Sequence, residues 1–219
     1  MPPAFADRRD AGRRLAADLA GLGPAGEVVV LGLPRGGVPV AAEVALALGA
    51  PLDVLVVGKV GVPGHEELAL AAVADDGSVA VNPGVIAATG MTADEVDELA
   101  RAHASALRRR ATELRGDRAP VAVEGRTVVV VDDGMATGAT MRVALEVVRH
   151  RHPRALVAAV PVASADAAAA VATLADRLVC VLTPPGFRAV GPWYADFTQV
   201  SDDEVRDLLA SAVQRADDA

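Results

Sequence analysis

The sequence predicts a single α/β domain in which a mainly parallel sheet is flanked by helices. Apolar, Val-rich runs alternate with helical stretches along the chain, an order typical of strands joined by helical crossovers. Each run is apolar throughout, as expected of strands that are covered on both faces. The chain has 219 residues, of which 52% are hydrophobic but only 2% aromatic, so the core must consist of Val, Leu and Ala.

The apolar runs and the stretches between them define the expected elements. We expect buried strands over residues 27–33, 52–57, 127–131, 155–162 and 177–182. We expect helices over residues 6–22, 38–48, 140–150 and 164–175. Two further helices begin with capping boxes: Thr92 with Glu95 opens a long helix over 93–114, and Ser201 with Glu204 opens a last one to about residue 213.

Residues 58–83 fit this scheme poorly because they are rich in Gly and Pro. They contain only short apolar pieces, at 68–73 and 78–81. We expect a long excursion here, with a small antiparallel ribbon. It follows a buried strand directly and so lies at the edge of the sheet where ligands bind in such folds. Long loops of this kind often close over an active site, so we expect a mobile loop.

The charge balance excludes some classes of partner. The formal net charge is -8 and the pI is near 5.0, which argues against non-specific binding to nucleic acid or to an anionic membrane surface. The N-terminus has no apolar segment suited to secretion, and no apolar stretch reaches the roughly 18 residues of a membrane helix. The single cysteine, Cys180, excludes a disulfide framework. We therefore expect a cytoplasmic protein.

Two carboxylates directly follow the strand at 127–131. Small residues and two hydroxyls come next and lead into a helix; the whole set is Asp132, Asp133, Gly134, Ala136, Thr137, Gly138, Ala139 and Thr140. Small side chains let a phosphate approach the backbone, and the N–H groups and dipole of the following helix favour its charge. The carboxylates can accept hydrogen bonds from vicinal ribose hydroxyls or orient waters around Mg²⁺.

Three other interpretations of this segment have to be weighed. A strand followed by acids is also the Mg²⁺-binding half of a P-loop NTPase, but the chain contains no G-x-x-x-x-G-K-[ST]. A dinucleotide fold needs G-x-G-x-x-G after the first strand, and residues 32–37 (GLPRGG) do not supply it. The third is an ordinary strand–turn–helix connection, in which Asp caps the helix and Gly makes the turn.

Residues 128–140, VVVVDDGMATGAT, resemble the signature with which type I phosphoribosyltransferases bind 5-phosphoribosyl-1-pyrophosphate (PRPP). The resemblance implies a Rossmann-like α/β fold. It also implies that Asp132 and Asp133 bind the ribose 2′- and 3′-hydroxyls. The 5′-phosphate would be held by Ala136, Thr137, Gly138, Ala139 and Thr140.

Two neighbouring segments are similar to further parts of the same family. Residues 33–37 resemble its pyrophosphate loop, which implies contacts from Arg35, Gly36 and Gly37; a simple Pro/Gly turn is the alternative. Lys59 stands where family members carry a basic pair ahead of a mobile loop, but Gly58 replaces one of the two cations. His65 would approach the leaving group when the loop closes, or it is a solvated loop histidine.

The whole chain resembles a narrower branch, the predicted bacterial phosphoribosyltransferases of uncharacterised acceptor, through residues 33–37, 61–68 and 190–199. This implies one domain over residues 1–219, with a core over about 25–182 and a small hood built from the terminal segments, about 1–24 and 183–219. Trp193 and Tyr194 would stack on a planar acceptor or shape its pocket. The alternative is that they pin the C-terminal segment to the core.

The resemblance implies transfer of a 5-phosphoribosyl group from PRPP to an unidentified nitrogenous acceptor, with release of pyrophosphate. The catalytic residues would be Arg35, Lys59, Asp132 and Asp133. Mg²⁺ would be the cofactor, carried on PRPP and contacted through water by one of the two aspartates. The partners would be PRPP and a small-molecule acceptor, and the resemblance leaves room for a homodimer.

Two features limit this expectation. Ala136 stands where the 6-oxopurine branch has an acid that assists proton transfer, so hypoxanthine–guanine salvage is disfavoured. Gly58 keeps open the alternative of a PRPP-binding sensor without transferase activity. An enzyme that makes PRPP is a poorer match, because the chain is short and lacks a recognised ATP motif.

Overall fold

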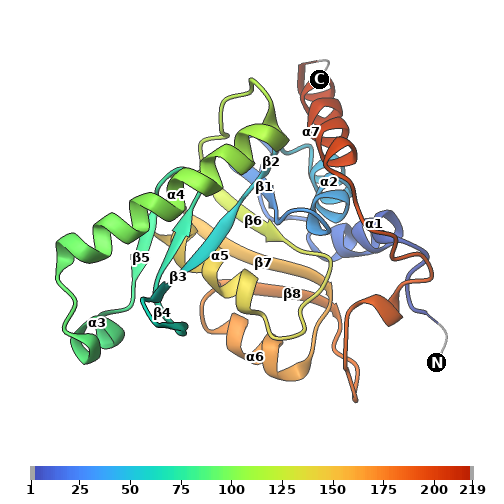
Figure 1. Cartoon of the computed structure of the whole chain (residues 1–219). Helices are drawn as coiled ribbons and strands as arrows, with labels where there is room; N and C mark the ends of the chain where they lie inside the picture. Colours follow the sequence, from blue (N-terminus) through green and yellow to red (C-terminus); the bar gives the residue numbers. More distant parts are fainter. Residues whose placement is uncertain (1–2, 218–219) are drawn as a thin grey trace.

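The architecture comes from a computed structural model that describes residues 3–217. Its centre is a fully parallel sheet, with the strands in the order β2-β1-β6-β7-β8 (Figure 1). The strands are β1 (Val28–Gly32), β2 (Leu52–Val54), β6 (Thr127–Val131), β7 (Ala155–Val162) and β8 (Arg177–Leu182). Gly32 pairs with Val131, so β1 and β6 end at the same level. The two loops that follow these strands therefore begin side by side.

Helices cover both faces of this sheet, as predicted. Alternate residues of β1 enter two separate cores: Val28 and Val30 face one, and Val29 and Leu31 the other. The first core is covered by α1 (Arg8–Asp18), α2 (Gly37–Leu48) and α7 (Asp202–Asp217), the second by α5 (Ala139–Arg149) and α6 (Ala165–Ala172). None of the described helices is long and apolar enough to cross a membrane.

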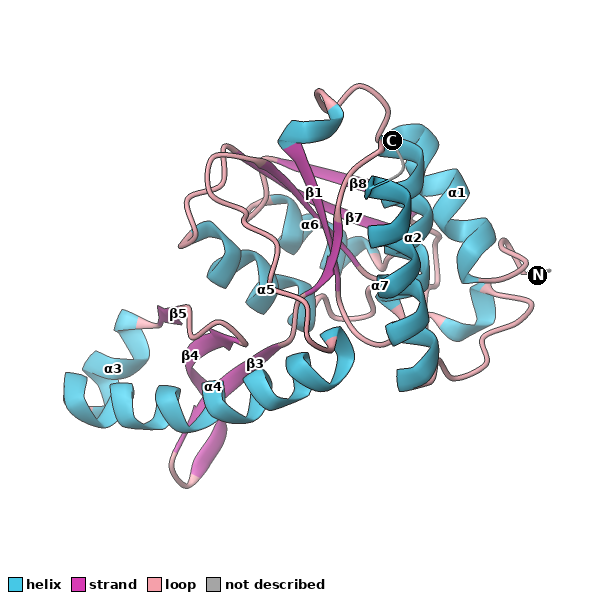
Figure 2. Cartoon of the chain, turned by 90° about the horizontal axis from the view of Figure 1, so that it is seen from above, coloured by secondary structure: helices cyan, strands magenta, loops and turns pink. Residues whose placement is uncertain are grey.

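The predicted ribbon within residues 58–83 is present and is larger than expected. It is a three-stranded antiparallel sheet of β3 (Val57–Val62), β4 (His65–Ala74) and β5 (Val79–Val81). It is followed by α3 (Pro83–Thr89) and packs on α4 (Ala93–Arg115) around a core of its own. Figure 2 shows this unit beside the parallel sheet, with the β3–β4 hairpin pointing away from it. The region is therefore a packed unit of regular structure and not mainly a loop.

Several element boundaries differ from the predicted ones. The expected strand over 52–57 ends at Val54, because the chain leaves the parallel sheet there and begins β3 at Val57. The helix α3 was not predicted, although Asn82 accepts a hydrogen bond from the N–H of Val85 and caps it. Helices α1 and α6 are shorter than expected, and α7 extends beyond residue 213. The long helix over 93–114 is confirmed, together with its capping box.

The N-terminal segment at Phe5 and the segment at Trp193 lie side by side next to the sheet. The N–H groups of Ala4 and Phe5 both donate to the carbonyl of Trp193, at 2.9 and 3.0 Å. The ring of Phe5 lies 5.4 Å from that of Tyr194, and both side chains are buried. This small apolar cluster includes Val162 of β7, so it fixes the terminal segments close to the ends of the central strands.

Candidate functional site

The loop after β1 packs directly onto the two carboxylates that follow β6. A β-carbon on Gly36 would lie 2.1 Å from Oδ2 of Asp133, which is closer than any side chain can approach. A β-carbon on Gly37 would lie 2.6 Å from the carbonyl oxygen of Val131 and 2.8 Å from the Cα of Asp132. Only glycine fits at these two positions, since any side chain would push the loop away from the carboxylates.

Burial raises the pKa values of both carboxylates. It raises the pKa of Asp132 well above its ordinary value, and the neighbouring charge of Asp133 raises it further. Burial also raises the pKa of Asp133, while the guanidinium of Arg8 acts in the opposite direction. The backbone N–H of Asp133 donates to Oδ1 of Asp132 at 2.9 Å and fixes its orientation. Two adjacent carboxylates with raised pKa values at a strand end are typical of a functional site.

Arg8 is a site residue that the sequence did not reveal. Its Nε lies 2.8 Å from Oδ2 of Asp133, and only 11% of the Arg8 side chain and 14% of the Asp133 side chain are exposed. Its Nη1 donates to the carbonyl of Thr198 at 2.8 Å, and its guanidinium lies 3.9 Å from the ring centre of Phe197. In the sequence, an arginine at the start of an amphipathic helix is indistinguishable from a solvated cation.

The loop after Asp133 leads into α5 through Gly138, whose φ of 70° is a left-handed conformation that favours glycine. Ser164 holds this loop by donating to the carbonyl of Ala136 at 2.8 Å. Apart from the buried Gly138, the residues from Ala136 to Thr140 are exposed. The N-cap residues of α5 and α2 are Gly138 and Gly36, which have no side chain to cap the helix. The N–H of Ala139, the first residue of α5, donates to Oγ1 of Thr137 at 3.3 Å. The N–H groups of Gly37 and Val38 at the start of α2 donate to the carbonyls of Leu33 and Arg35. What favours a bound anion at this sheet edge is therefore the positive end of each helix dipole.

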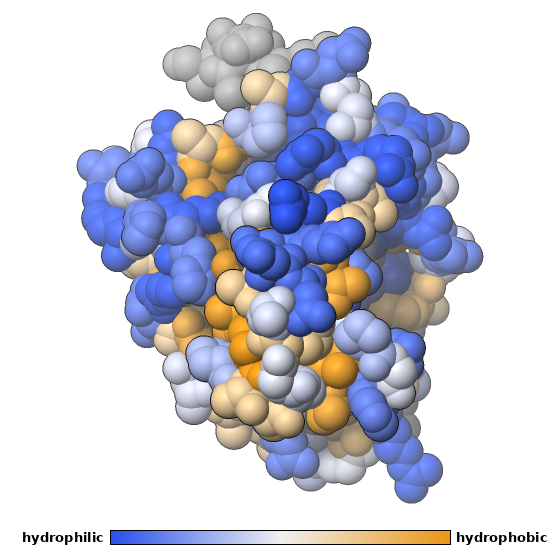
Figure 3. Space-filling view, turned by 60° about the vertical axis from the view of Figure 1, so that its left-hand side comes forward, coloured by the Kyte–Doolittle hydropathy of each residue, from blue (hydrophilic) through white to orange (hydrophobic). Residues whose placement is uncertain are grey.

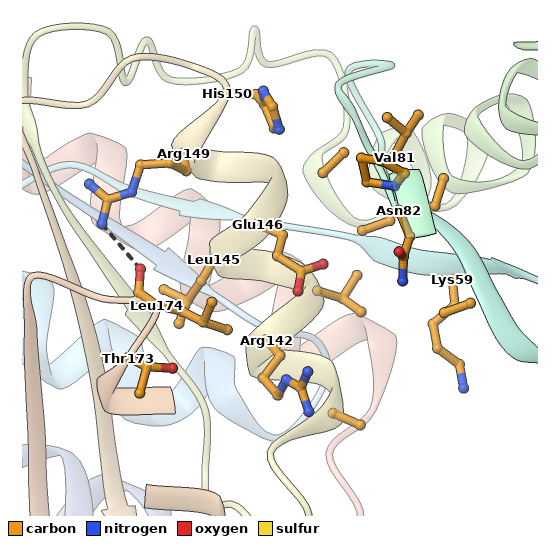
Figure 4. Close-up of a pocket in the computed structure, with 17 residues that line it drawn as sticks. Lys59, Val81, Asn82, Arg142, Leu145, Glu146, Arg149, His150, Thr173 and Leu174 are labelled. Carbon is orange, nitrogen blue, oxygen red and sulfur yellow. Dashed lines mark hydrogen bonds between the residues drawn. The ribbon is translucent and has the colours of Figure 1, made fainter. Parts of the chain in front are cut away.

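A cavity of about 740 Å³ lies between the antiparallel sheet and α5. Figure 3 shows apolar side chains gathered on part of the side of the molecule that carries the antiparallel sheet, bordered by hydrophilic ones. In Figure 4, Lys59 of β3 and Arg142 of α5 extend into the gap from opposite sides. Both are exposed, and within residues 3–217 the charged group of neither forms an ion pair or hydrogen bond. Ala139, at the start of α5, lines the same cavity.

The charged groups of Arg35 and His65 do not contact the Asp132–Asp133 pair. The guanidinium of Arg35 lies 3.6 Å from Oδ1 of Asp202, a carboxylate at the start of α7. Asp202 also binds Arg110 of α4, at 2.5 and 2.6 Å. His65 is exposed at the tip of the β3–β4 hairpin, which points away from the parallel sheet (Figure 2). Gly36 and Gly37 therefore pack against the two carboxylates, whereas the guanidinium of Arg35 is paired with Asp202 instead.

Trp193 and Tyr194 have different surroundings. Tyr194 is buried between Phe5 and Phe197, and its hydroxyl donates to the carbonyl of Asp133 at 2.6 Å. Burial raises the pKa of Tyr194, so this hydroxyl remains a donor. Trp193 is half-buried and stacks on Phe187, with the ring planes within 3°. Tyr194 therefore joins the C-terminal segment to the site, whereas contact of Trp193 with an acceptor stays a prediction.

The chain is similar to known proteins over most of its length. A family model described as a phosphoribosyl transferase domain matches residues 6–187. Two relatives, from two strains of Mycobacterium tuberculosis, are each 50% identical over 208 residues, and their names describe them provisionally as phosphoribosyl transferases. The solved structure of TT1426 from Thermus thermophilus has 45% identity and a TM-score of 0.85, and the match covers 96% of this chain and 99% of TT1426.

The two sets of relatives differ in length. The match covers 95% of this chain but only 47% of the Mycobacterium proteins, so the chain spans about half the length of these curated relatives. TT1426, in contrast, corresponds to this chain over almost its full length. The matches to all three relatives thus cover 95% or more of this chain.

Proposed function

Because the chain belongs to the phosphoribosyltransferase family, we propose that it transfers a 5-phosphoribosyl group from PRPP to a nitrogenous small-molecule acceptor and releases pyrophosphate. The observation that carries the proposal is the close contact of Gly36 and Gly37 with the Asp132–Asp133 pair. It joins a carboxylate pair suited to ribose hydroxyls to a loop that leads into the N-terminus of α2, where the helix dipole favours an anion. These are the two chemistries that PRPP requires.

Each part of PRPP has a counterpart at this edge. The loop from Ala136 to Thr140 offers its backbone N–H groups, the hydroxyls of Thr137 and Thr140 and the N-terminus of α5 to the 5′-phosphate. Asp132 and Asp133 accept hydrogen bonds from the ribose hydroxyls. The backbone of Gly36 and Gly37 approaches the pyrophosphate, and Lys59 and Arg142 add positive charge from the neighbouring cavity.

The reaction breaks the bond between ribose C1 and a pyrophosphate oxygen and forms a bond between C1 and the acceptor nitrogen. The electron pair of the broken bond leaves with pyrophosphate, while C1 becomes oxocarbenium-like. The protein needs no nucleophile; it stabilises the growing negative charge through N–H groups and cations and keeps C1 in line with the acceptor. Arg35 contributes to that charge only after its guanidinium leaves Asp202.

Mg²⁺ is proposed to arrive with PRPP. The residues fit this role, because Asp132 and Asp133 are acidic oxygen donors next to the proposed pyrophosphate loop. When bound, Mg²⁺ neutralises charge on the pyrophosphate. Asp132 or Asp133 would contact it through water.

The acceptor is proposed to bind next to the terminal segments, which form the hood and carry the half-buried Trp193. Ala136 cannot assist proton transfer, so an acceptor that needs an acid there, such as a 6-oxopurine, is disfavoured. We propose a cytoplasmic enzyme acting on small molecules, in keeping with the net charge of -8.

The test is an assay of pyrophosphate release with PRPP, Mg²⁺ and a panel of bases and amines, beside calorimetric titration of PRPP. The matched variant is Asp132→Asn with Asp133→Asn, which keeps side-chain size and removes the charges. We expect PRPP binding to be lost in this variant without unfolding. Unchanged PRPP affinity in the double variant would show that the site is assigned wrongly. Binding by the wild type without turnover on any acceptor would favour the PRPP sensor.

A further inference from the structure

Arg8 connects three parts of the molecule that are distant in sequence. It comes from α1, it forms a largely buried ion pair with Asp133 at the end of β6, and it binds the C-terminal segment through Thr198 and Phe197. Asp133 receives a second contact from that segment, because Tyr194 donates to its carbonyl oxygen. Arg8 thus holds the side chain of Asp133, and Tyr194 holds its backbone.

The ion pair leaves room on the carboxylate. Oδ2 of Asp133 is the oxygen that contacts Arg8 and that lies against Gly36. A carboxylate offers about four lone-pair positions on two oxygens, so Oδ1 can still accept a hydrogen bond. Since the guanidinium binds through one oxygen, it holds the plane of the carboxylate and leaves the other oxygen for a hydroxyl donor.

The ion pair also sets the charge of Asp133. Burial raises the pKa of this carboxyl, and Arg8 opposes that rise through its hydrogen bond and its charge. A hydroxyl donates a stronger hydrogen bond to an ionised carboxylate than to a neutral acid. A cation in contact with Asp133 therefore favours the form that binds ribose hydroxyls.

We infer that Arg8 is a positioning residue for the ribose of PRPP: it holds the Asp133 carboxylate in the orientation that accepts a ribose hydroxyl. The inference rests on the proposed function. It assigns Arg8 to the ribose and not to the pyrophosphate, because the pyrophosphate loop has supports of its own. Leu33 donates to the carbonyl of Val131 at 2.9 Å, and Gly37 donates to that of Leu33 at 3.0 Å.

The experiment compares two ligands, PRPP and inorganic pyrophosphate, by calorimetry on the full chain with Mg²⁺. Arg8→Met keeps most of the side-chain volume and removes the charge. We expect it to weaken PRPP binding about tenfold, since a hydrogen bond to a charged group is lost, and to change pyrophosphate binding less than about twofold. Arg8→Lys restores part of the PRPP affinity, because an ammonium can pair with Asp133 but lacks the planar fork that also reaches Thr198.

Two further variants complete the design. Arg13→Gln is the control, because Arg13 lies on the same helix, is 58% exposed and lies 3.9 Å from its partner Glu43; it should bind both ligands like the wild type. Phe197→Leu keeps Arg8 but removes the ring beneath its guanidinium. It should weaken PRPP binding less than Arg8→Met does, and it should leave pyrophosphate binding nearly unchanged. Phe197→Leu and Arg8→Lys test the inference if Arg8→Met does not fold.

Unchanged or tighter PRPP binding by a folded Arg8→Met protein would overturn the inference. Equal weakening of PRPP and pyrophosphate would overturn it too, because Arg8 would then support the fold of the whole edge. Failure of the wild type to bind PRPP is a different result, since it overturns the proposed function itself.

Discussion

Gly36 and Asp133 are in direct contact: a β-carbon on Gly36 would lie 2.1 Å from Oδ2 of the aspartate. The same oxygen accepts a hydrogen bond from Nε of Arg8 at 2.8 Å, so it lies between a glycine of the β1 loop and a cation from the N-terminal helix. One carboxylate thereby connects the proposed pyrophosphate loop to the proposed ribose site. Because there is no room for a side chain at Gly36, a substitution there should change ligand binding and stability.

Gly36→Ala should disrupt this contact. The added methyl group must displace either the carboxylate or the loop, and we expect PRPP affinity to fall about tenfold or more and stability to fall by about 1–3 kcal/mol. Calorimetry and thermal unfolding measure the two effects. Gly26→Ala is the matched control, because a β-carbon there meets nothing within 4 Å. Wild-type affinity in Gly36→Ala would mean that the loop does not need this contact.

PRPP affinity should fall on acidification at a higher pH than an exposed aspartate would cause. The pKa of Asp132 is raised in the free protein, and a ribose hydroxyl binds the ionised form better. Protons therefore compete with PRPP as the pH falls through the raised pKa. At pH values above that pKa, Asp132 is ionised and its titration no longer changes the affinity for PRPP. Titrations of PRPP affinity that run downward from about pH 8 toward the ordinary aspartate pKa of about 3.9 test this direction.

Inorganic pyrophosphate is the control for this pH series, because its phosphates titrate but it has no ribose hydroxyls. The difference between the two profiles reports on the carboxylates. Parallel profiles for PRPP and pyrophosphate would contradict the role of Asp132.

Lys59→Gln and Arg142→Gln should each weaken pyrophosphate binding. Both cations are exposed and line the same cavity beside Ala139, so each loss should cost about threefold to tenfold at low salt and much less at about 0.5 M salt. Arg101→Gln removes an equally charged, exposed side chain from α4 and should change nothing. An effect of Arg101→Gln as large as that of Arg142→Gln would show that only the net charge matters.

Arg115 should be essential for the junction between the two sheets. It is buried and binds Asp53 of β2 at 2.8 Å and Asp75, just after β4, at 3.1 Å. Arg115→Met leaves two buried carboxylates without their cation and should cost about 3–5 kcal/mol in the free energy of unfolding. Urea denaturation measures it. Arg13 is exposed, so Arg13→Gln should cost less than about 0.5 kcal/mol. Similar losses of stability in the two variants would contradict the proposed role of Arg115.

Much of the fold followed from local sequence. Apolar runs such as 127–131 predict buried strands because every residue in them must be covered, and the Thr92–Glu95 capping box marks a helix start through contacts within a single turn. The loop from Asp132 to Thr140 could also be predicted from local sequence, because its carboxylates, its small residues and the following helix N-terminus are contiguous. The three-stranded sheet in residues 58–83 was predicted less well, because its pairing joins strands across a bulge.

The sequence by itself thus determined the strand–loop–helix units and the two loops that meet at the ends of β1 and β6. Only the tertiary structure decided which charged side chains reach that edge. Arg8 arrives there from α1, 125 residues away from Asp133, and Arg142 faces Lys59 across a cavity, whereas Arg35 pairs with Asp202. The physical reason is that a backbone conformation follows from neighbouring residues, but an ion pair depends on which distant segments the packed core brings together.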